Sequence, residues 1–183
     1  MKKKETNIIQ FYRSLIGAIS LPLFTIIGVT VLYLILMSFL DHKAFPFDYI
    51  IVVLALVKTY FIGTSTFKNL SKLVTNVVSL KRLLLIFGSI IIVTVLSFTV
   101  DYSCLYEYQQ SSFSGVQDYS NSYLIKVSEF FYFSVTTFAT VGFGDIVPVS
   151  GIARILVLLE ISLSFLIIVF GLANINKIHI NEK

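Results

Sequence analysis

The sequence is poor in charged residues. Lys, Arg, Asp and Glu make up only 13% of its 183 residues, whereas a soluble domain carries about 25%. Apolar side chains account for 56% of the chain, and the mean hydropathy is +0.89. These apolar residues are gathered in long uncharged blocks, which excludes a disordered chain, a collagen-like repeat and a disulfide-rich scaffold. The composition therefore predicts an integral membrane protein.

Cysteine and histidine are also scarce. Cys104 is the single cysteine, so it forms either a bridge between two subunits or a free thiol. His42 and His179 are far apart, which argues against a metal cluster. The net charge of +4 is not concentrated in a stripe typical of nucleic-acid binding. Catalytic motifs are not found, so we expect no enzyme activity, no cofactor, no nucleic acid and no small-molecule substrate.

Four apolar segments are long enough, or nearly so, to cross a hydrocarbon layer of about 30 Å. We predict transmembrane helices at residues 14–40, 48–67, 83–100 and 152–175. The first segment is too long for a signal-peptide core and is followed by no evident cleavage site, so it is expected to be retained. An even number of spans places both termini on the same side of the membrane.

The basic residues indicate on which side of the membrane the termini lie. They are concentrated in the N-terminus and in the link between the second and third spans: Lys2, Lys3, Lys4, Arg13, Lys68, Lys72, Lys81 and Arg82. The positive-inside rule makes both segments cytoplasmic, and hence both termini. The other loops carry mostly acidic residues, among which we count Asp101 and Asp145, and are expected to face outward. A multi-pass protein of a bacterial plasma membrane, in contact with lipids, is the expected result.

Residues 70–80 alternate apolar and polar side chains at helical spacing. Leu70, Leu73, Val77 and Leu80 lie opposite Lys72, which favours a short amphipathic helix on the inner membrane surface. The alternative is that the second and third spans extend beyond the bilayer.

The loop of about fifty residues between the last two spans is long enough to be functional. Residues 128–139 are apolar and aromatic but too short to cross a bilayer, so they predict a re-entrant half-helix with Ser128 as its N-cap and Glu129 in its first turn. Its inner end would direct a partial negative charge toward a cation. The tyrosines of this region are expected to form an interfacial aromatic belt: Tyr102, Tyr106, Tyr108, Tyr119 and Tyr123.

The half-helix is followed by Thr140-Val141-Gly142-Phe143-Gly144-Asp145. Glycine adopts mirror-image backbone conformations freely, so the alternation of Gly142 and Gly144 with bulky residues can turn successive carbonyl groups toward one axis. Backbone oxygens arranged in this way replace the water shell of a dehydrated cation.

This hexapeptide resembles the selectivity filter of potassium channels, with Phe143 where tyrosine is commonest. The resemblance extends through the half-helix and both flanking spans. It implies K⁺ sites formed by the carbonyl groups of Thr140, Val141, Gly142 and Phe143, together with the Thr140 hydroxyl, in a filter that ends at Gly144. Asp145 would lie at the outer mouth. A phenylalanine keeps the carbonyl but lacks the phenol that could brace the filter, which affects filter stability rather than selectivity.

Because such a pore needs four loops and the chain supplies one, the resemblance implies a homotetramer. We therefore expect an all-α membrane protein with four transmembrane helices per chain, a re-entrant half-helix and a tetrameric pore. Its parts would be an N-terminal membrane region (1–82), a pore module (83–176) and a short cytoplasmic tail (177–183).

Other residues are candidates for supporting or gating this pore. Glu160 lies about nine residues into the last span, where a carboxylate must be paired, wet or protonated. It is predicted either to support the filter by bonding the half-helix at Tyr132, Thr136 or Thr137, or to be a neutral acid in a helix contact. For gating, the candidates are Ser164, Gly171 and Lys58. Lys58 is either a gating charge, a snorkelling side chain or a partner of an acid such as Glu160.

Two other functions remain open from the sequence. A potassium uptake transporter subunit would be expected to carry four pore loops in one chain, whereas this chain has one. A nonconducting subunit that modulates another channel would give no flux when purified alone.

Overall fold

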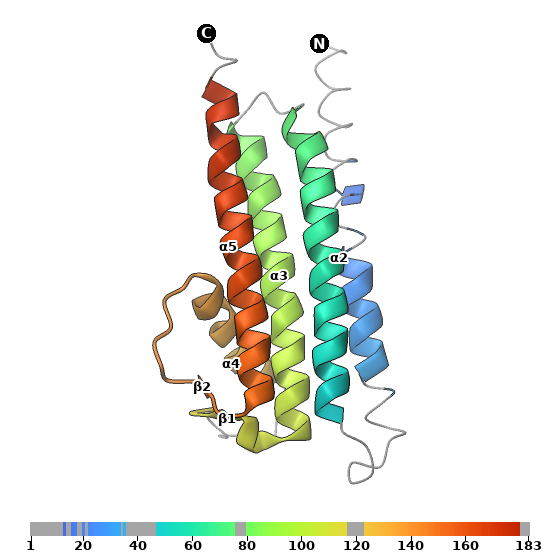
Figure 1. Cartoon of the computed structure of the whole chain (residues 1–183), viewed down its shortest axis with the longest axis vertical. Coiled ribbons are helices and arrows are strands. Elements are labelled where there is room, and N and C mark those ends of the chain that lie inside the picture. Colours follow the sequence, from blue (N-terminus) through green and yellow to red (C-terminus); the bar gives the residue numbers. More distant parts are fainter. Residues whose placement is uncertain are drawn as a thin grey trace.

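The structure is a computed structural model that describes residues 13, 16–17, 20, 22–33, 35, 47–75, 80–116 and 123–179. Its described elements are mostly helical, as the sequence predicts: the apolar helical segment Pro22–Tyr33, α2 (Phe47–Thr75), α3 (Leu80–Tyr108), η1 (Gln110–Ser112), β1 (Phe113–Ser114), α4 (Tyr123–Phe138), β2 (Val147–Pro148) and α5 (Gly151–His179) (Figure 1).

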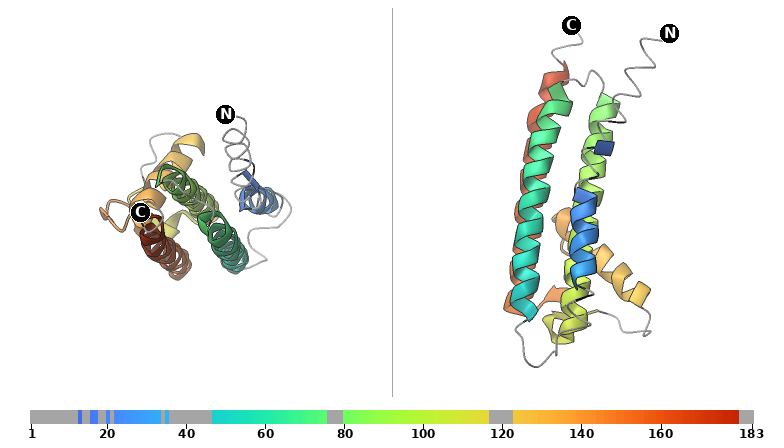
Figure 2. Two further views of the ribbon diagram at one scale, coloured as in Figure 1. Left: turned by 90° about the horizontal axis from the view of Figure 1, so that it is seen from above. Right: turned by 90° about the vertical axis from the view of Figure 1, so that its right-hand side faces the viewer.

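Three long helices, α2, α3 and α5, stand side by side, and α4 packs against one half of α3 (Figure 1). The loop after α4 protrudes from the bundle before the chain returns through β2 into α5. The helical segment Pro22–Tyr33 lies beside α2, on the side away from α5 (Figure 2). α3 is therefore the central helix, and it contacts α2, α4 and α5.

Two described helices are long and apolar enough to cross a membrane, namely Leu84–Tyr108 and Gly151–Ala173. These correspond to the third and fourth predicted spans. The helices Pro22–Tyr33 and Tyr49–Thr64 are apolar but shorter over the residues described. The membrane-capable pair thus flanks α4, while the count of four spans stays a prediction.

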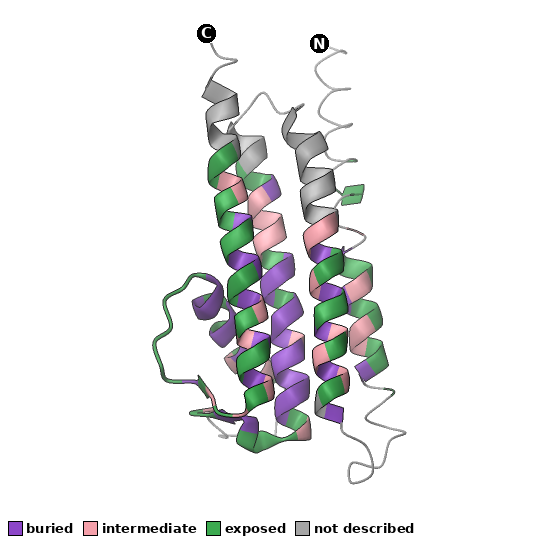
Figure 3. Ribbon diagram, viewed as in Figure 1, coloured by how far each residue is buried: buried purple, intermediate pink, exposed green. Residues whose placement is uncertain are grey.

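α3 extends eight residues beyond the predicted end of its span. Asp101 was expected in an outer loop, but it lies within this helix and is fully buried. Tyr102 and Tyr106 are buried as well, so the predicted aromatic belt is wrong for these two residues. The buried surface covers most of this half of α3 (Figure 3). The prediction ended the span at the first charged residue, whereas that charge finds a partner inside the bundle. Tyr119 lies outside the described residues.

The amphipathic segment and the half-helix also differ from expectation. Residues 70–75 continue α2 rather than forming a separate surface helix, and residues 76–79 lie outside the described ranges. α4 begins at Tyr123, five residues before the predicted N-cap. Ser128 is thus inside the helix, where its hydroxyl donates to the carbonyl of Ile125 at 2.7 Å. Hydrogen bonding within the helix replaces the expected capping role.

Candidate functional site

The loop after α4 has an alternating backbone. Thr140, Gly142 and Gly144 have positive φ angles of 56°, 54° and 79°, whereas Val141 and Phe143 between them do not. Thr140 is the one non-glycine residue with a positive φ among the residues described. A β-branched residue adopts this conformation rarely, and such strain clusters at functional sites. The sequence analysis expected the unusual backbone conformations at Gly142 and Gly144 and did not predict the positive φ of Thr140.

The amides of this loop are tied to the end of α4. The Thr140 N–H donates to the Thr137 carbonyl at 3.0 Å, and the N–H groups of Val141 and Gly142 donate to the Thr136 carbonyl at 2.9 and 3.4 Å. Within the described part of the chain, the carbonyl oxygens of residues 140–143 accept no hydrogen bond. The loop therefore leaves its oxygens available for another ligand.

Thr136 and Thr137 contact the loop 140–144 through their backbone. The Thr136 hydroxyl instead donates to the Phe133 carbonyl of its own helix at 3.0 Å. Both side chains are buried. Their predicted hydrogen bonds with Glu160 are therefore not formed, and their support of the loop comes from main-chain carbonyl groups at the C-terminal end of α4.

Asp145 is fixed at the end of the loop by two hydrogen bonds. Its Oδ2 accepts a bond from the Tyr132 hydroxyl at 2.7 Å, and its Oδ1 accepts one from the Ile146 N–H at 3.0 Å. The Tyr132 bond is the main cause that holds the pKa of Asp145 below its ordinary value. The ring of Phe143 stacks on Tyr132, with centroids 6.2 Å apart and an interplanar angle of 7°. Tyr132 therefore contacts both Phe143 and Asp145.

A small two-stranded sheet holds the segment after Asp145. β1 pairs with β2 in antiparallel register, with Phe113 opposite Pro148 and Ser114 opposite Val147. Gly115 follows β1 with a φ of 84°, and a Cβ at this position would lie 1.7 Å from the Asp145 carbonyl oxygen. Glycine is required here by both conformation and space. Sequence reasoning missed this contact, because it joins residues thirty positions apart.

Glu160 lies at a junction of three helices, α3, α4 and α5. It is fully buried on α5, where its Oε1 accepts a bond from Ser134 of α4 and its Oε2 one from Tyr102 of α3, both at 2.5 Å. The half-helix is thus its partner, as the sequence suggested, but the bonding residue is Ser134. Tyr102 was missed because it was assigned to the loop. Phe130, Ser134 and Thr137 are all buried, and their spacing of four and three residues places them on one face of α4. This spacing is the sequence signal that could have identified Ser134.

Lys58 does not pair with Glu160. Its ammonium lies 2.6 Å from Asp101 Oδ1, and both side chains are buried. Of the predicted alternatives for Lys58, pairing with an acid is therefore the one observed. The acid is Asp101 of α3 rather than Glu160 of α5. Cys104, on the next turn of α3, is a buried free thiol.

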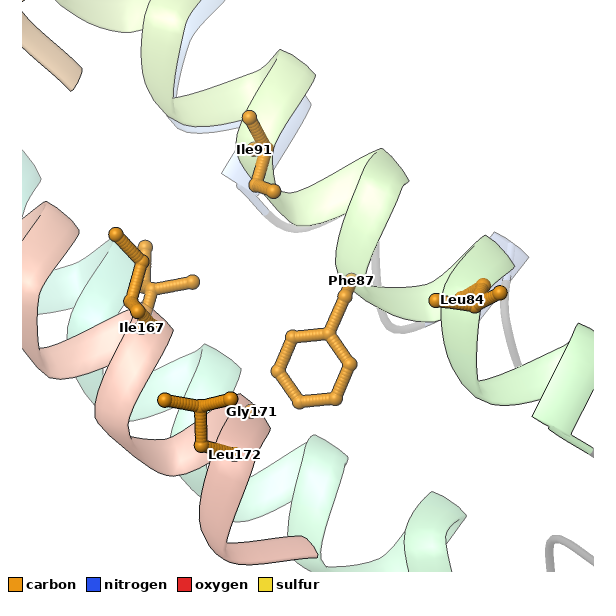
Figure 4. A pocket seen from close by; sticks show the side chains of 7 residues that line it. Leu84, Phe87, Ile91, Ile167, Gly171 and Leu172 are labelled. Atoms are coloured by element: carbon orange, nitrogen blue, oxygen red, sulfur yellow. The ribbon is translucent and has the colours of Figure 1, made fainter. Parts of the chain in front are cut away.

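The two other gating candidates lie on α5. Ser164 is buried, and its hydroxyl donates to the Ile161 carbonyl one turn earlier at 2.9 Å. Gly171 faces Phe87 of α3, whose ring would lie 3.1 Å from a Cβ at this glycine. An apolar groove of about 160 Å³ opens here between α3 and α5 (Figure 4). It is lined by Leu84, Phe87, Ile91, Ile167, Ile168, Gly171 and Leu172.

The described residues contain no group of three His, Cys, Asp or Glu side chains that could hold a metal ion. The loop offers the backbone oxygens of residues 140–143 and, at its end, the carboxylate of Asp145. Such an arrangement suits a monovalent cation that exchanges its water shell for carbonyl groups.

Comparison with known proteins identifies the family of the chain. Residues 83–180, more than half of the chain, match the sequence profile of the family described as Ion channel. An 89-residue stretch is 36% identical to the two-pore potassium channel 4 of Arabidopsis thaliana, and it covers 49% of this chain and 28% of that protein. The comparison with solved structures gives no match. Both matching sequences support the resemblance to a potassium channel pore module, and the chain belongs to the ion channel family.

Proposed function

We propose that four copies of the chain form a channel that passes K⁺ down its electrochemical gradient. The observation that carries the proposal is the loop 140–144, whose φ angles alternate in sign while its amides bond to the end of α4. This arrangement leaves the carbonyl oxygens of Thr140, Val141, Gly142 and Phe143 as ligands for a dehydrated cation. The Thr140 hydroxyl would complete the innermost site.

The exposure of the single chain supports a tetramer. Val141 is 54% exposed and Phe143 is 69% exposed, although both are apolar. The whole loop lies on the surface (Figure 3). One loop provides one side of a carbonyl-lined pore, and three more copies around the same axis would complete it. Lipid and neighbouring subunits would cover the exposed apolar face of α5, which includes Leu158, Phe165 and Leu172.

The charge pattern supports a plasma-membrane protein with both termini in the cytoplasm. Asp145 would then face the outside, where a carboxylate attracts cations to the mouth of the pore. The lowered pKa of Asp145 keeps this charge in place over a wider range of external pH. We infer that the protein acts as a conduit for K⁺ and not as an enzyme.

The test is cation flux through the purified chain in liposomes under K⁺, Rb⁺ and Na⁺ gradients. We expect K⁺ and Rb⁺ to pass and Na⁺ to be excluded. Gly144→Ala should abolish flux, because φ at this position is 79°, whereas Gly88→Ala is the matched control in α3, where a Cβ meets nothing within 4 Å. Equal passage of Na⁺ and K⁺ would contradict selectivity, and no flux from the native chain would favour a modulatory subunit.

A further inference from the structure

The proposed pore module leaves one buried cluster unexplained, where α2 meets α3. The Lys58 ammonium of α2 donates to Asp101 Oδ1 at 2.6 Å and to the Ser97 carbonyl at 2.8 Å. The Tyr33 hydroxyl donates to the same Asp101 oxygen at 3.1 Å. Tyr33, Lys58 and Asp101 are all at most 1% exposed. A full positive and a full negative charge are therefore enclosed where the surrounding helices are apolar.

Stability alone does not account for this cluster. Among the described residues, Asp101 Oδ2 and the hydroxyl groups of Ser97 and Thr59 are buried without a hydrogen-bond partner. A buried ion pair with unsatisfied atoms is often no more stable than well-packed apolar residues. What the pair does provide is a fixed register, because Lys58 bonds to Ser97 and Asp101, which are one turn apart on α3. It fixes both the height and the rotation of this turn relative to α2.

The same turn of α3 carries the hydroxyl that reaches Glu160. Asp101 and Tyr102 are consecutive, so their side chains leave the helix about 100° apart. Asp101 points to Lys58 and Tyr33, while Tyr102 donates to Glu160, which also accepts from Ser134 of α4. Tyr102 packs against the rings of Phe113 and Phe133, with centroids 5.6 and 5.1 Å away. A small rotation of α3 at Asp101 would therefore move the Tyr102 hydroxyl.

The contacts continue from Ser134 to the filter. Two and three residues after Ser134, the carbonyl groups of Thr136 and Thr137 hold the amides of Thr140, Val141 and Gly142. An unbroken series of close contacts thus joins α2 to the filter loop, and every member is buried or part of the backbone.

We propose that Lys58 and Asp101 are positioning residues for the filter: the ion pair fixes the turn of α3 that presents Tyr102 to Glu160, and α2 thereby controls how firmly the filter is held. This inference rests on the proposed function and gives the helices before the pore a regulatory role. A change in the position of α2 would alter the lifetime of the conducting filter without altering the pore itself.

The test is a double-mutant cycle with recordings of single channels in K⁺. Asp101→Leu should shorten the open-state lifetime about tenfold, the effect expected when one buried hydrogen bond is lost, and leave the unitary conductance unchanged. In the Tyr102→Phe background, where the link to Glu160 is already cut, Asp101→Leu should change the lifetime less than about twofold. Equal effects of Asp101→Leu in both backgrounds would overturn the proposal.

Two further variants separate positioning from stability. The neutral pair Lys58→Gln with Asp101→Asn can still form hydrogen bonds between α2 and α3, so it should restore the lifetime to within about twofold of the native value. Ile62→Ala removes a buried apolar side chain one turn along α2 and should lower the thermal midpoint without shortening the lifetime. A shortened lifetime in Ile62→Ala would show that general loosening of α2 is sufficient, and the ion pair would have no special role.

Amide hydrogen exchange provides a readout that does not need conduction. The amides of Val141 and Gly142 should exchange faster in Asp101→Leu than in the native chain, and should keep their native rate in Ile62→Ala. If the native chain passes no K⁺ while this difference persists, the proposed function fails and the coupling stands. If the native chain conducts and the exchange rates do not differ, the coupling fails.

Discussion

At the scale of single residues, the proposed pore depends on a few hydroxyl groups. The Tyr132 hydroxyl holds Asp145, and the Ser134 and Tyr102 hydroxyls hold Glu160. Each of these donors can be removed with little change of shape, since Tyr→Phe and Ser→Ala delete few atoms. Their roles can thus be measured one at a time.

Tyr132→Phe should make the outer mouth more sensitive to acid. The variant keeps the ring that stacks on Phe143 but loses the bond to Asp145, the main cause of that residue's lowered pKa. The pKa of Asp145 should therefore rise toward the ordinary value of about 3.9. Because the group is charged above its pKa, the K⁺ conductance should begin to fall at a higher external pH than in the native channel.

Conductance measured against external pH checks this prediction. Asp145→Asn is the control, since it has no charge to lose and should show no such titration. Superimposable curves for the native channel and Tyr132→Phe would refute the role assigned to Tyr132.

Glu160→Gln should weaken the junction behind the filter. Glutamine keeps one acceptor oxygen, but its NH₂ group can only donate, so the second hydroxyl must accept instead of donate and one of the two 2.5 Å bonds is replaced by a weaker one. A hydrogen bond contributes about 0.5–1.5 kcal/mol, and we expect the free energy of unfolding to fall by up to this amount and the open-state lifetime to shorten. Chemical denaturation and single-channel recording measure the two effects.

Glu107→Gln is the matched control, because its carboxylate lies 3.2 Å from Lys126 at the exposed end of α3. Partly exposed pairs of this kind contribute about 0–1 kcal/mol. If both glutamine variants behaved alike, Glu160 would be an inert helix contact.

At the scale of elements, the two-stranded sheet of β1 and β2 connects the segment before α4 to the segment after the loop 140–144. The backbone of Ser112 accepts bonds from Val149 and Ser150 at 2.8 and 3.2 Å, which extends the pairing. The loop is therefore held at both ends, by α4 before it and by the sheet after it. Such double anchoring is what a strained residue such as Thr140 requires.

Gly115→Ala should disrupt this anchor. The new Cβ would overlap the Asp145 carbonyl, and the positive φ alone disfavours alanine by about 1–3 kcal/mol. We expect a lower free energy of unfolding and loss of K⁺ flux, measured by denaturation and in liposomes. Gly88→Ala is the control and should be neutral or slightly stabilising, since alanine favours a helix. Normal flux in Gly115→Ala would show that the sheet of β1 and β2 does not hold the filter.

The elements also show how far the sequence could lead. The order of a span, a half-helix, a glycine-containing loop and a second span followed from hydropathy and from Thr140–Asp145. The partners of Glu160 and Lys58 did not follow, because Asp101 and Tyr102 were assigned to a loop by the rule that a charge ends a span. Long-range pairing of buried polar residues overrides that rule, and it has no signature within one short stretch of sequence.

At the scale of the whole molecule, orientation decides what each face of the channel meets. The eight basic residues of the N-terminus and of residues 68–82, where α2 ends and α3 begins, predict that both termini are cytoplasmic. A reporter fused after Lys183 should therefore behave as cytoplasmic, as should one inserted in the link at residue 77. An extracytoplasmic signal from the C-terminal fusion would require a different number of spans.

The whole channel should also respond weakly to voltage. Moving one charge through the full membrane field yields about 2.3 kcal/mol per 100 mV, so four copies of Lys58 could supply at most about 9 kcal/mol. Lys58 is paired with Asp101, however, and if α2 and α3 moved together the pair would carry no net charge. If α2 moved alone, separating the pair would require about 3–5 kcal/mol in each subunit. This exceeds the roughly 2.3 kcal/mol that a change of 100 mV supplies to one charge.

We therefore expect a shallow conductance–voltage curve whose slope is unchanged in Lys58→Gln, although the open-state lifetime of that variant differs. The reason is that a fixed ion pair positions the filter without crossing the field. Recordings of the native channel and of Lys58→Gln over a range of about 100 mV decide the point, since a gating charge in each subunit would contribute about 2.3 kcal/mol over that range. A steep native curve that flattens in Lys58→Gln would show that Lys58 moves, and that its pairing with Asp101 represents one of two gating positions.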